Sequence, residues 1–439
     1  MVRAMLSSFA SQYYQISLVL ILAAFSIPIS RKIAVADIPI LILMGLIFGP
    51  FLGIIHHSFA IYFMTEFGSV GIGILGIVII LYYESHNINF RVIRRHFWNI
   101  VSLDTLGLVV TALVGGAIFS LMFRAPFSIG FMFGAIISPT DPATLIPLFK
   151  RIRIKEDVSG TLVGESIFND PLSIILFTIA VAMVAPTSSY VSFFTSISSR
   201  VGIPLASVIY LLIQITVPSI IGIVVGFSVL YLNRLLNFEN LLVALLLGTV
   251  LLEFTVLEAS GITPFPAIIA TGAIVGNFSD KSIFWNRESN FQENLSFLAQ
   301  AVIFILLGSV VTRADLRAYI PYGIAISLAV MLVVRPISVY VSTLPTRAKW
   351  MPRRIDRKVV TFMSLVGPRG VVSVVLSTLP YAIGLVDANP LLLKWGPLIS
   401  VMTAFVVLIS IVVQTVYVPV ISHRLFGMAE AKPGDKSEE

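Results

Sequence analysis

Residues 126–149 read PFSIGFMFGAIISPTDPATLIPLF, an apolar stretch interrupted near its centre by Ser-Pro-Thr-Asp-Pro at 138–142. About 20 apolar residues cross the hydrocarbon core of a bilayer as a helix. Pro139 and Pro142 each remove a backbone donor and clash with a preceding carbonyl, so the helix must break here. Non-helical backbone at this depth is tolerated only beside protein or a water-filled cavity. The stretch therefore predicts a broken membrane helix beside such a cavity.

The composition of the whole chain agrees with a membrane location. Of 439 residues, 57% are hydrophobic and only 12% are charged, whereas a soluble domain has about 25% charged residues. The other apolar runs are continuous for roughly 20 residues rather than alternating over about 10, which favours helices over a barrel. We therefore expect an all-α polytopic protein embedded in the lipid bilayer.

Thirteen apolar windows separated by polar or charged breaks predict thirteen transmembrane helices. They are residues 12–30, 34–54, 65–85, 99–121, 126–149, 157–184, 203–232, 239–258, 264–280, 291–311, 318–343, 359–384 and 392–422. The seventh window follows a Ser/Thr-rich segment that we expect to be a loop.

The basic residues predict the orientation of these spans. Of the 29 Lys and Arg residues, 21 lie in loops on one side and six on the other, and Arg335 and Arg369 lie within spans. Because basic loops stay in the cytoplasm, we expect the N-terminus outside the cell membrane and the C-terminus inside. Membrane topology also accounts for the net charge of +7 without a nucleic-acid partner.

Several other classes of protein are disfavoured. The chain has no cysteine, so we expect no disulfide or thiolate chemistry. It contains no nucleotide-binding motif, which argues against ATP-driven transport, and we expect no cofactor. Arg31 and Lys32 directly follow the first apolar segment, which is typical of a retained first helix rather than a cleaved signal peptide.

The broken spans suggest an internal repeat. A second interruption, Gly-Pro-Arg-Gly at 367–370, falls in the twelfth span, seven spans after the first and in the opposite direction. Corresponding interrupted segments in two halves indicate a transporter site at the membrane midplane. The predicted units are a first six-helix repeat at 1–184, a linker with the seventh helix at 185–238, a second inverted repeat at 239–422 and a short cytoplasmic tail at 423–439.

Asp141 has the surroundings of a cation ligand. The two prolines free the carbonyls of Ala135 and Ser138, and Thr140 adds a hydroxyl. Carbonyl, carboxylate and hydroxyl oxygens are hard ligands that suit hard cations such as sodium. A kink without function would not need an aspartate between the prolines.

A second polar motif, Gly-Glu-Ser-Ile-Phe-Asn-Asp-Pro, occupies residues 164–171 of the sixth span. Residues four apart lie on one side of a helix, which pairs Glu165 with Asn169 and Ser166 with Asp170. An ionisable group in the membrane costs at least about 2.5–3.5 kcal/mol, so it indicates function. We expect Asp141 and Asp170 to form the centre of an ion site.

Two arginines lie within predicted spans. Arg335 cannot lose its charge and needs a buried carboxylate, for which we predict Glu165. Arg369 belongs to the second helix break. The remaining acidic residues in spans, namely Glu84, Asp104, Glu253 and Glu258, lie where a helix end or a structural pair would also explain them.

Three motifs together show a family resemblance. Ser-Pro-Thr-Asp-Pro (138–142), Gly-Glu-Ser-Ile-Phe-Asn-Asp (164–170) and Gly-Pro-Arg-Gly-Val-Val-Ser (367–373) resemble the monovalent cation/proton antiporter family, in the branch of NhaP and the eukaryotic sodium/proton exchangers. The resemblance implies an NhaA-like fold with thirteen helices, two broken crossing helices, a core domain and a dimerisation domain, and a homodimer.

The same resemblance implies residue roles. Asp170 would bind the ion or the proton with help from Asp141, while Ser166 and the backbone of Thr140 would complete the sodium ligands. Glu165 would reach the ion through water and pair with Arg335, and Asn169 would brace the broken helix. Glu84 resembles a glutamate of the family's third helix. Ser85 and His86 replace the usual Gly-Leu, and Pro368 precedes Arg369, which leaves substrate preference open.

The expected function is exchange of Na⁺ or Li⁺ for H⁺ in pH homeostasis, with ion and proton competing for Asp170. Desolvation and the nearby Asp141 would both favour proton uptake by Asp170. Asn169, where some relatives have a second aspartate, resembles the electroneutral one-for-one branch. The alternatives are a K⁺/H⁺ antiporter, a cation channel and an intramembrane aspartyl protease, although the last lacks its usual Gly-x-Gly-Asp.

Overall fold

The fold is described from a computed structural model, in which residues 2–33, 37–65, 72–88, 90–141, 156–280, 282–347 and 356–426 are placed. Within these ranges the regular structure is entirely helical. The helices of the first half are α1 (Val2–Ile33), α2 (Asp37–Leu46), α3 (His57–Thr65), α4 (Ile72–His86), α5 (Phe90–Ser102), α6 (Leu108–Phe123), α7 (Phe127–Ile136) and α9 (Glu156–Val184). Those that follow are α10 (Ser192–Val201), α11 (Ile203–Leu236), α12 (Leu242–Ala259), α13 (Phe265–Phe278), α14 (Ile283–Val310), α15 (Arg313–Ala329), α16 (Arg335–Ser342), α17 (Arg357–Leu365), α18 (Val371–Val386) and α19 (Pro390–Phe426).

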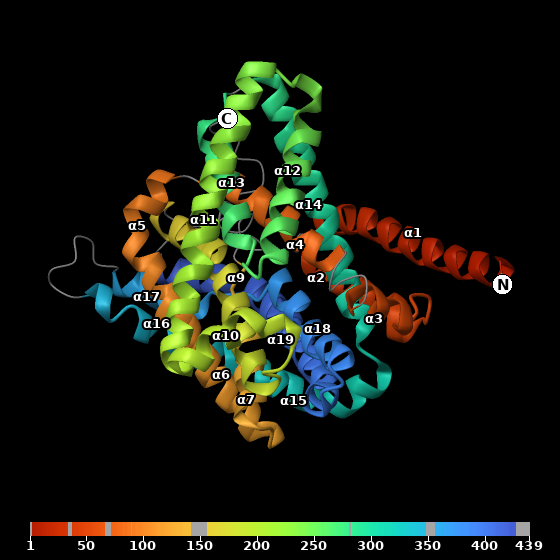
Figure 1. The fold of residues 1–439 in the computed structure, drawn as a ribbon. Helices are drawn as coiled ribbons and strands as arrows, with labels where there is room; N and C mark the ends of the chain where they lie inside the picture. The colour runs from red at the N-terminus through yellow and green to blue at the C-terminus, as the bar shows by residue number, and fades with distance from the viewer. Residues whose placement is uncertain are drawn as a thin grey trace.

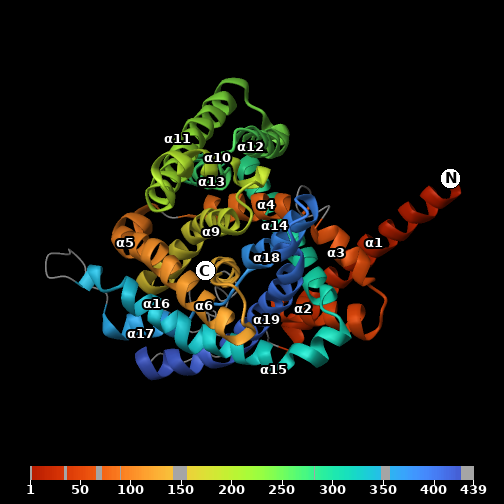
Figure 2. The same ribbon diagram turned by 60° about the horizontal axis from the view of Figure 1, so that its bottom comes forward.

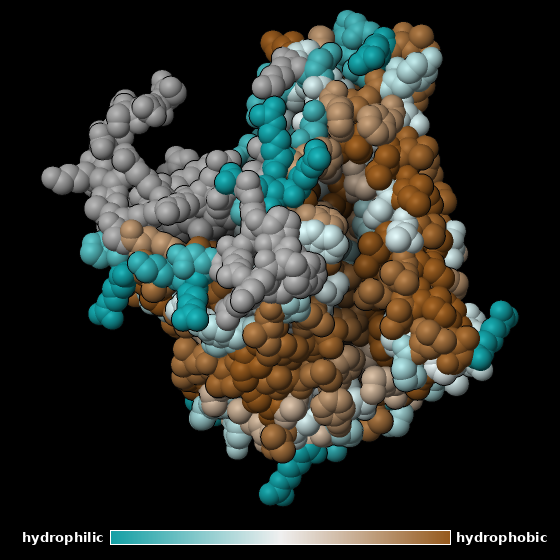
Figure 3. Space-filling model, turned by 90° about the vertical axis from the view of Figure 1, so that its left-hand side faces the viewer, coloured by the Kyte–Doolittle hydropathy of each residue, from teal (hydrophilic) through white to brown (hydrophobic). Residues whose placement is uncertain are grey.

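The described helices confirm a polytopic membrane protein. Eight of them are long and apolar enough to cross a membrane, and five shorter apolar helices accompany them. Each predicted span overlaps one of these helices, while the number of membrane crossings stays a prediction. Figure 3 shows hydrophobic atoms covering most of one face of the molecule, as expected where lipid is the solvent.

The helices differ in how deeply they are buried, and this difference locates the centre of the molecule. In α9, 83% of the apolar window is buried, compared with 22% in α11. Figure 2 shows α9 between the group of α10 to α13 and the group of α5, α6, α16 and α17. The 164–171 motif therefore lies on a central helix. By contrast, α1 projects away from the body of the protein (Figure 1).

Small residues allow the central helices to approach closely. A Cβ added at Gly134 of α7 would lie 2.1 Å from the carbonyl oxygen of Ala112 in α6, and one added at Gly116 would lie 2.7 Å from that of Gly130. Contacts this short require glycine, because backbone atoms cannot move aside for a side chain. The close α6–α7 pair holds α7 against the bundle up to the point where it breaks.

Both predicted helix breaks are present. Helix α7 ends at Ile136, and residues 137–141 are not helical, while 142–149 of the predicted fifth span lie outside the described residues. Helices α17 and α18 are separated by the non-helical residues 366–370. Three further irregularities were not expected, namely π-helical turns at Ile47–Phe51, Leu103–Gly107 and Val330–Val334, in the second, fourth and eleventh predicted spans.

Two sequence expectations need correction. The Ser/Thr-rich segment contains helix α10, in which hydroxyls such as those of Thr195 and Ser199 donate to carbonyls three residues earlier. Such local bonds satisfy the polar side chains without breaking a helix. Of the third predicted span, residues 66–71 lie outside the described residues, and residues 72–85 belong to helix α4, which continues to His86. The last helix continues to Phe426 rather than ending at 422, and the rest of the predicted tail lies outside the described residues.

Candidate functional site

The two helix breaks meet and are joined by their backbones. The backbone N–H of Asp141 donates to the carbonyl of Pro368 at 2.8 Å. A Cβ added at Gly370 would lie 2.3 Å from both Cβ and Oδ2 of Asp141. Residues more than 220 positions apart in the chain thus share one crossing point, and Gly370 is required there because any side chain would displace Asp141.

Arg369 donates hydrogen bonds to the backbone carbonyl groups of the first break. Its Nη1 donates to the carbonyls of Ser138 at 2.9 Å and Pro139 at 3.1 Å. The Ser138 hydroxyl in turn donates to the carbonyl of Ala135 at 2.7 Å. The carbonyls of Ala135 and Ser138, which the sequence suggested as free ion ligands, are therefore satisfied within the protein. Buried backbone groups left without a partner would be costly, and this arrangement avoids that cost.

Asn169 braces the same segment from α9. Its Nδ2 donates to the Thr140 hydroxyl at 2.9 Å and lies 3.4 Å from the Thr140 carbonyl. Because Nδ2 occupies both oxygens of Thr140, this side chain fixes the broken segment next to the central helix. Ser166, one turn before Asp170, is buried but does not line the cavity described next.

Both aspartates face one small cavity. Its lining brings together carboxyl groups from three different elements, and the full set is Ile77, Ile80, Glu84, Pro139, Asp141, Asp170, Gly370, Val371, Val372 and Ser373. Asp170 itself is 8% exposed. Three carboxylates around an otherwise apolar cavity cannot all hold a negative charge without a cation or a proton. The cavity can therefore bind either.

Arg335 and Glu165 form a buried bidentate ion pair beside this cavity. Nη1 and Nη2 of Arg335 lie 2.5 and 3.0 Å from the two carboxylate oxygens of Glu165, and the side chains are almost fully buried. The Arg335 Nε also reaches the carbonyls of Met363 and Val366, both at 3.2 Å. The pair predicted from charge compensation is thus present, and it also holds α17 at the second break. Both carboxylate oxygens of Glu165 accept hydrogen bonds from Arg335.

Two neighbouring features differ from the sequence expectations, in which a helix end or a structural pair explains Asp104 and two polar residues of α19 have no role. Asp104 is buried in the π-helical turn of the fourth span, and neither of its oxygens accepts a hydrogen bond from the described residues. Ser410 and Gln414 of α19 accept from the backbone N–H groups of Arg369 and Gly367 at 3.2 and 2.9 Å. The signal for the latter pair was available, since two polar residues four apart in an apolar span share a helix face.

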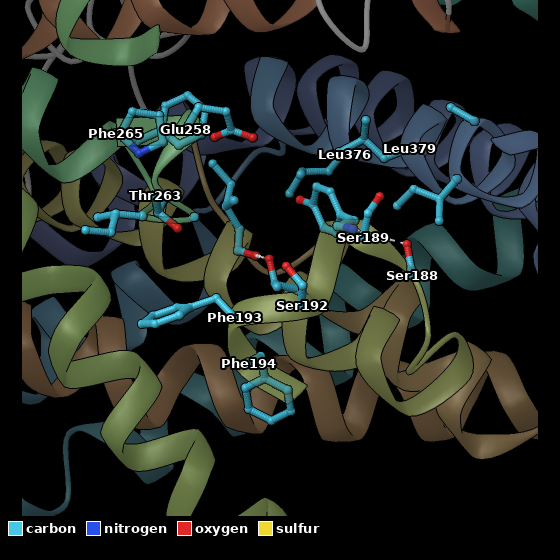
Figure 4. A pocket seen from close by; sticks show the side chains of 18 of the residues that line it. Ser188, Ser189, Ser192, Phe193, Phe194, Glu258, Thr263, Phe265, Leu376 and Leu379 are labelled. Carbon is cyan, nitrogen blue, oxygen red and sulfur yellow. Dashed lines mark hydrogen bonds between the residues drawn. The ribbon is translucent and has the colours of Figure 1, made fainter. Parts of the chain in front are cut away.

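A larger cavity adjoins the small cavity lined by Asp141 and Asp170, which we call the ion cavity. It has a volume of about 570 Å³ and is lined by the ends of α9, α12 and α18 together with the segment around α10. Figure 4 shows Glu258 and Leu376 on opposing walls. Ile77 lines both cavities, so they adjoin at this side chain. Glu253, in contrast, lies elsewhere, with both oxygens near the Thr271 hydroxyl.

An apolar helical bundle with paired carboxyl groups at the crossing of two broken helices defines a secondary cation transporter, not an enzyme. The chain belongs to the family described as sodium/hydrogen exchanger, transmembrane, which matches residues 19–423.

Characterised relatives are similar over most of the chain. Na⁺/H⁺ antiporter 1 of Methanocaldococcus jannaschii is 28% identical over 377 residues, covering 82% of this chain and 81% of that protein. The structure of the sodium proton antiporter MjNhaP1 from the same organism at pH 8 superposes with a TM-score of 0.81 and 26% identity, covering 95% of this chain and 99% of that one. The K⁺/H⁺ antiporter NhaP2 of Shewanella baltica is 26% identical and covers 73% of this chain but 51% of its own length.

Proposed function

We propose that this protein exchanges Na⁺ for H⁺ across the cell membrane, with the cation and the proton competing for Asp170. The observation that carries the proposal is the meeting of Asp170 and Asp141 in one small buried cavity at the crossing of the broken helices. A carboxyl group there stays neutral with a proton or compensates a cation, but a lone charge would be unfavourable. The likeness to Na⁺/H⁺ antiporters over four fifths of the chain supports sodium as the cation.

The cation ligands are taken to be Asp170 and Asp141, with Ser166 and Thr140 nearby on the same two elements. The hydroxyl of Thr140 already accepts a hydrogen bond from Asn169, and one lone pair remains for an ion. Glu165 and Arg335 hold the central helix and the second break in place rather than touching the ion. Glu84 from α4 faces the same cavity and acts as an accessory carboxyl group.

One-for-one exchange follows if a single carboxyl group alternates between ion and proton. Asn169 cannot take up a proton, so it adds no second charge. Electroneutral exchange does no work against the membrane potential, whereas each uncompensated charge contributes about 2.3 kcal/mol per 100 mV. Asn169→Asp should therefore make exchange sensitive to an imposed potential. If the parent protein already responds to the potential, electroneutrality is wrong.

The larger cavity provides the outer part of the ion path. It lies at the ends of spans that face away from the basic loops, and it adjoins the ion cavity at Ile77. Alternating access would open this junction while the other side is closed, by rocking the α9-containing core against the outer helices. The exposed apolar surfaces of α1 and α11 are the surfaces we assign to a homodimer.

Potassium is the second candidate cation, because the similar Shewanella protein bears the name of a K⁺/H⁺ antiporter. The decisive measurement uses purified protein in vesicles containing a pH-sensitive dye, to which Na⁺, Li⁺ or K⁺ is added. Dequenching with Na⁺ and Li⁺, but weakly with K⁺, is expected. Asp170→Asn should abolish it, and Asp280→Asn, an exposed aspartate, should not. Proton movement with none of the cations would overturn the proposal.

A further inference from the structure

A second buried polar group lies in the outer helices, apart from the ion cavity. Glu288, Gln292 and Ser296 follow one another at intervals of four along α14, so they share one face of that helix. All three are buried, and Glu288 is 0% exposed. Such a row is unusual in an apolar membrane helix, where polar side chains are expensive and mark function.

The row faces α4 and α12. Tyr82 of α4 lies within interaction distance of the Glu288 carboxyl group, and so does Gln292 on α14 itself. His86 follows one turn later on α4, with its ring 6.1 Å from that of Tyr82. Glu253 of α12 is the other carboxyl group that acts on Tyr82. Helix α4 packs on α12, α13 and α14, and α12 also packs on α13 and α14.

The Glu288 carboxyl group has no partner that could compensate a negative charge. Although Tyr82 and Gln292 lie nearby, neither of its oxygens forms a hydrogen bond of ordinary length and angle with the described residues, and the same holds for the buried Tyr82 hydroxyl. Glu253 differs, because the Thr271 hydroxyl lies 2.9 and 3.1 Å from its oxygens. Two unpartnered groups from different helices, both fully enclosed, therefore adjoin at this point.

No positively charged side chain is paired with Glu288 among the described residues. Tyr82 from α4 is the titratable group that adjoins Glu288, while His86 of α4 and Glu253 of α12 are neighbours of Tyr82, and none of the residues of α13 is titratable. The helices α1 and α2, which also pack on α14, have charged residues only near their ends, namely Arg3, Arg31 and Lys32 in α1 and Asp37 in α2. In the described part of the chain, no Lys or Arg forms an ion pair with Glu288. An isolated buried carboxylate is strongly unfavourable, whereas the neutral acid is tolerated.

We propose that Glu288 is a second proton-binding site, which is occupied in the folded protein and separate from the ion cavity. The bound proton makes the carboxyl group neutral and gives it a donor, which can be directed to the Gln292 amide or the Tyr82 hydroxyl. Ionisation would place an uncompensated charge between α14 and α4. The site thus senses the proton concentration without transporting an ion.

Helix α4 connects this site to the ion cavity. Tyr82 adjoins Glu288 from α4, while Ile80 and Glu84 of the same helix line the cavity that contains the two aspartates. A displacement of α4 on ionisation of Glu288 would therefore move Glu84 and Ile77. This second step rests on the proposed exchange function, but the proton-binding site itself does not.

The protonation state can be measured directly by infrared difference spectroscopy. The experiment uses the Asp170→Asn background, so that the ion cavity does not contribute its main carboxyl group. A band of a protonated carboxylic acid is expected at neutral pH, which Glu288→Gln removes and Tyr82→Phe shifts in frequency. Glu293→Gln, an exposed glutamate on the same helix, should leave the band unchanged. An identical band in the parent and in Glu288→Gln would overturn the proton site.

The coupling to transport is tested by the pH dependence of exchange. Glutamine mimics the neutral acid, so the rates of the parent and of Glu288→Gln should coincide at acidic pH. At alkaline pH they should diverge by about fivefold or more, the low end of typical coupling between sites. Coincident rates at every pH would overturn the coupling through α4 and leave the spectroscopic result standing. Absence of exchange in the parent would instead refute the proposed function.

Discussion

Replacing Arg335 by methionine should destabilise the folded protein more than any surface substitution. Arg335 is 5% exposed and Glu165 is 3% exposed, so water cannot replace the lost partner. The substitution leaves the Glu165 carboxylate uncompensated, and it removes the donor to the carbonyls of Met363 and Val366. Methionine is chosen because it retains much of the volume of the arginine side chain.

The expected size follows from the geometry of the pair. Removal of one member of a buried ion pair costs about 3–5 kcal/mol, because the other charge stays buried. One kcal/mol lowers the melting temperature by about 2–4 °C in chains of 150–250 residues. Scaled to this longer chain, the loss corresponds to roughly 5 °C. The double variant Glu165→Gln/Arg335→Met has no charge left to bury, so it should recover more than half of the loss.

The assay is thermal unfolding in detergent, followed by tryptophan fluorescence, with all variants prepared identically. Arg200→Met serves as the control, because Arg200 is exposed and surface substitutions change stability by about 0.5 kcal/mol or less. A melting temperature for Arg335→Met equal to that of the control would refute the reasoning. So would a double variant less stable than the single one, because it would mean that the two side chains act independently.

Three further predictions follow from other contacts. Gly370→Ala should abolish exchange, because its Cβ would overlap that of Asp141. The control Gly248→Ala, whose Cβ would have no atom within 4 Å, should retain exchange and gain about 0.5–1 kcal/mol in stability. Equal exchange activities of the two variants would contradict the close contact at Gly370. Arg369→Lys should lose at least half of the exchange rate at an unchanged protein yield, because a single ammonium replaces the guanidinium that spans two carbonyls. Unchanged transport would show that these hydrogen bonds are dispensable. Leu376→Cys should react with a membrane-impermeant thiol reagent added outside, since it lines the larger cavity and the parent has no cysteine; reaction only from the cytoplasmic side would reverse the proposed path.

The ion pair shows how far charge reasoning from sequence can reach. A permanently charged arginine in an apolar span must find a carboxylate, and few acidic residues lie at comparable depth, so Glu165 could be predicted. Whether the carbonyls freed by the prolines find hydrogen-bond donors within the protein could not be predicted from the sequence. Whether Ser138 offers its carbonyl oxygen to an ion depends on which side chain reaches it, and Arg369 lies about 230 residues further along the chain.

The further proton site illustrates the same limit. The sequence shows Glu288 only as one acidic residue near the start of the tenth predicted span. Its isolation from any positive charge follows from how α4, α12 and α14 face one another. Similarly, hydropathy gives no indication of the three π-helical turns, because a single added residue in a helix turn hardly changes local composition.

By itself, the sequence determined the membrane location, the approximate helix positions, the two helix breaks and the acidic residues available for an ion site. These properties depend on the composition and the local backbone chemistry of short segments, because lipid excludes charge and proline cannot continue a helix. Only the tertiary structure decided that Asp141, Asp170 and Glu84 share one cavity, that Arg369 closes the broken backbone, and that Glu288 stands alone. Those outcomes depend on the crossing of helices distant in sequence, and the contacts at a crossing are set by shape and packing rather than by hydropathy.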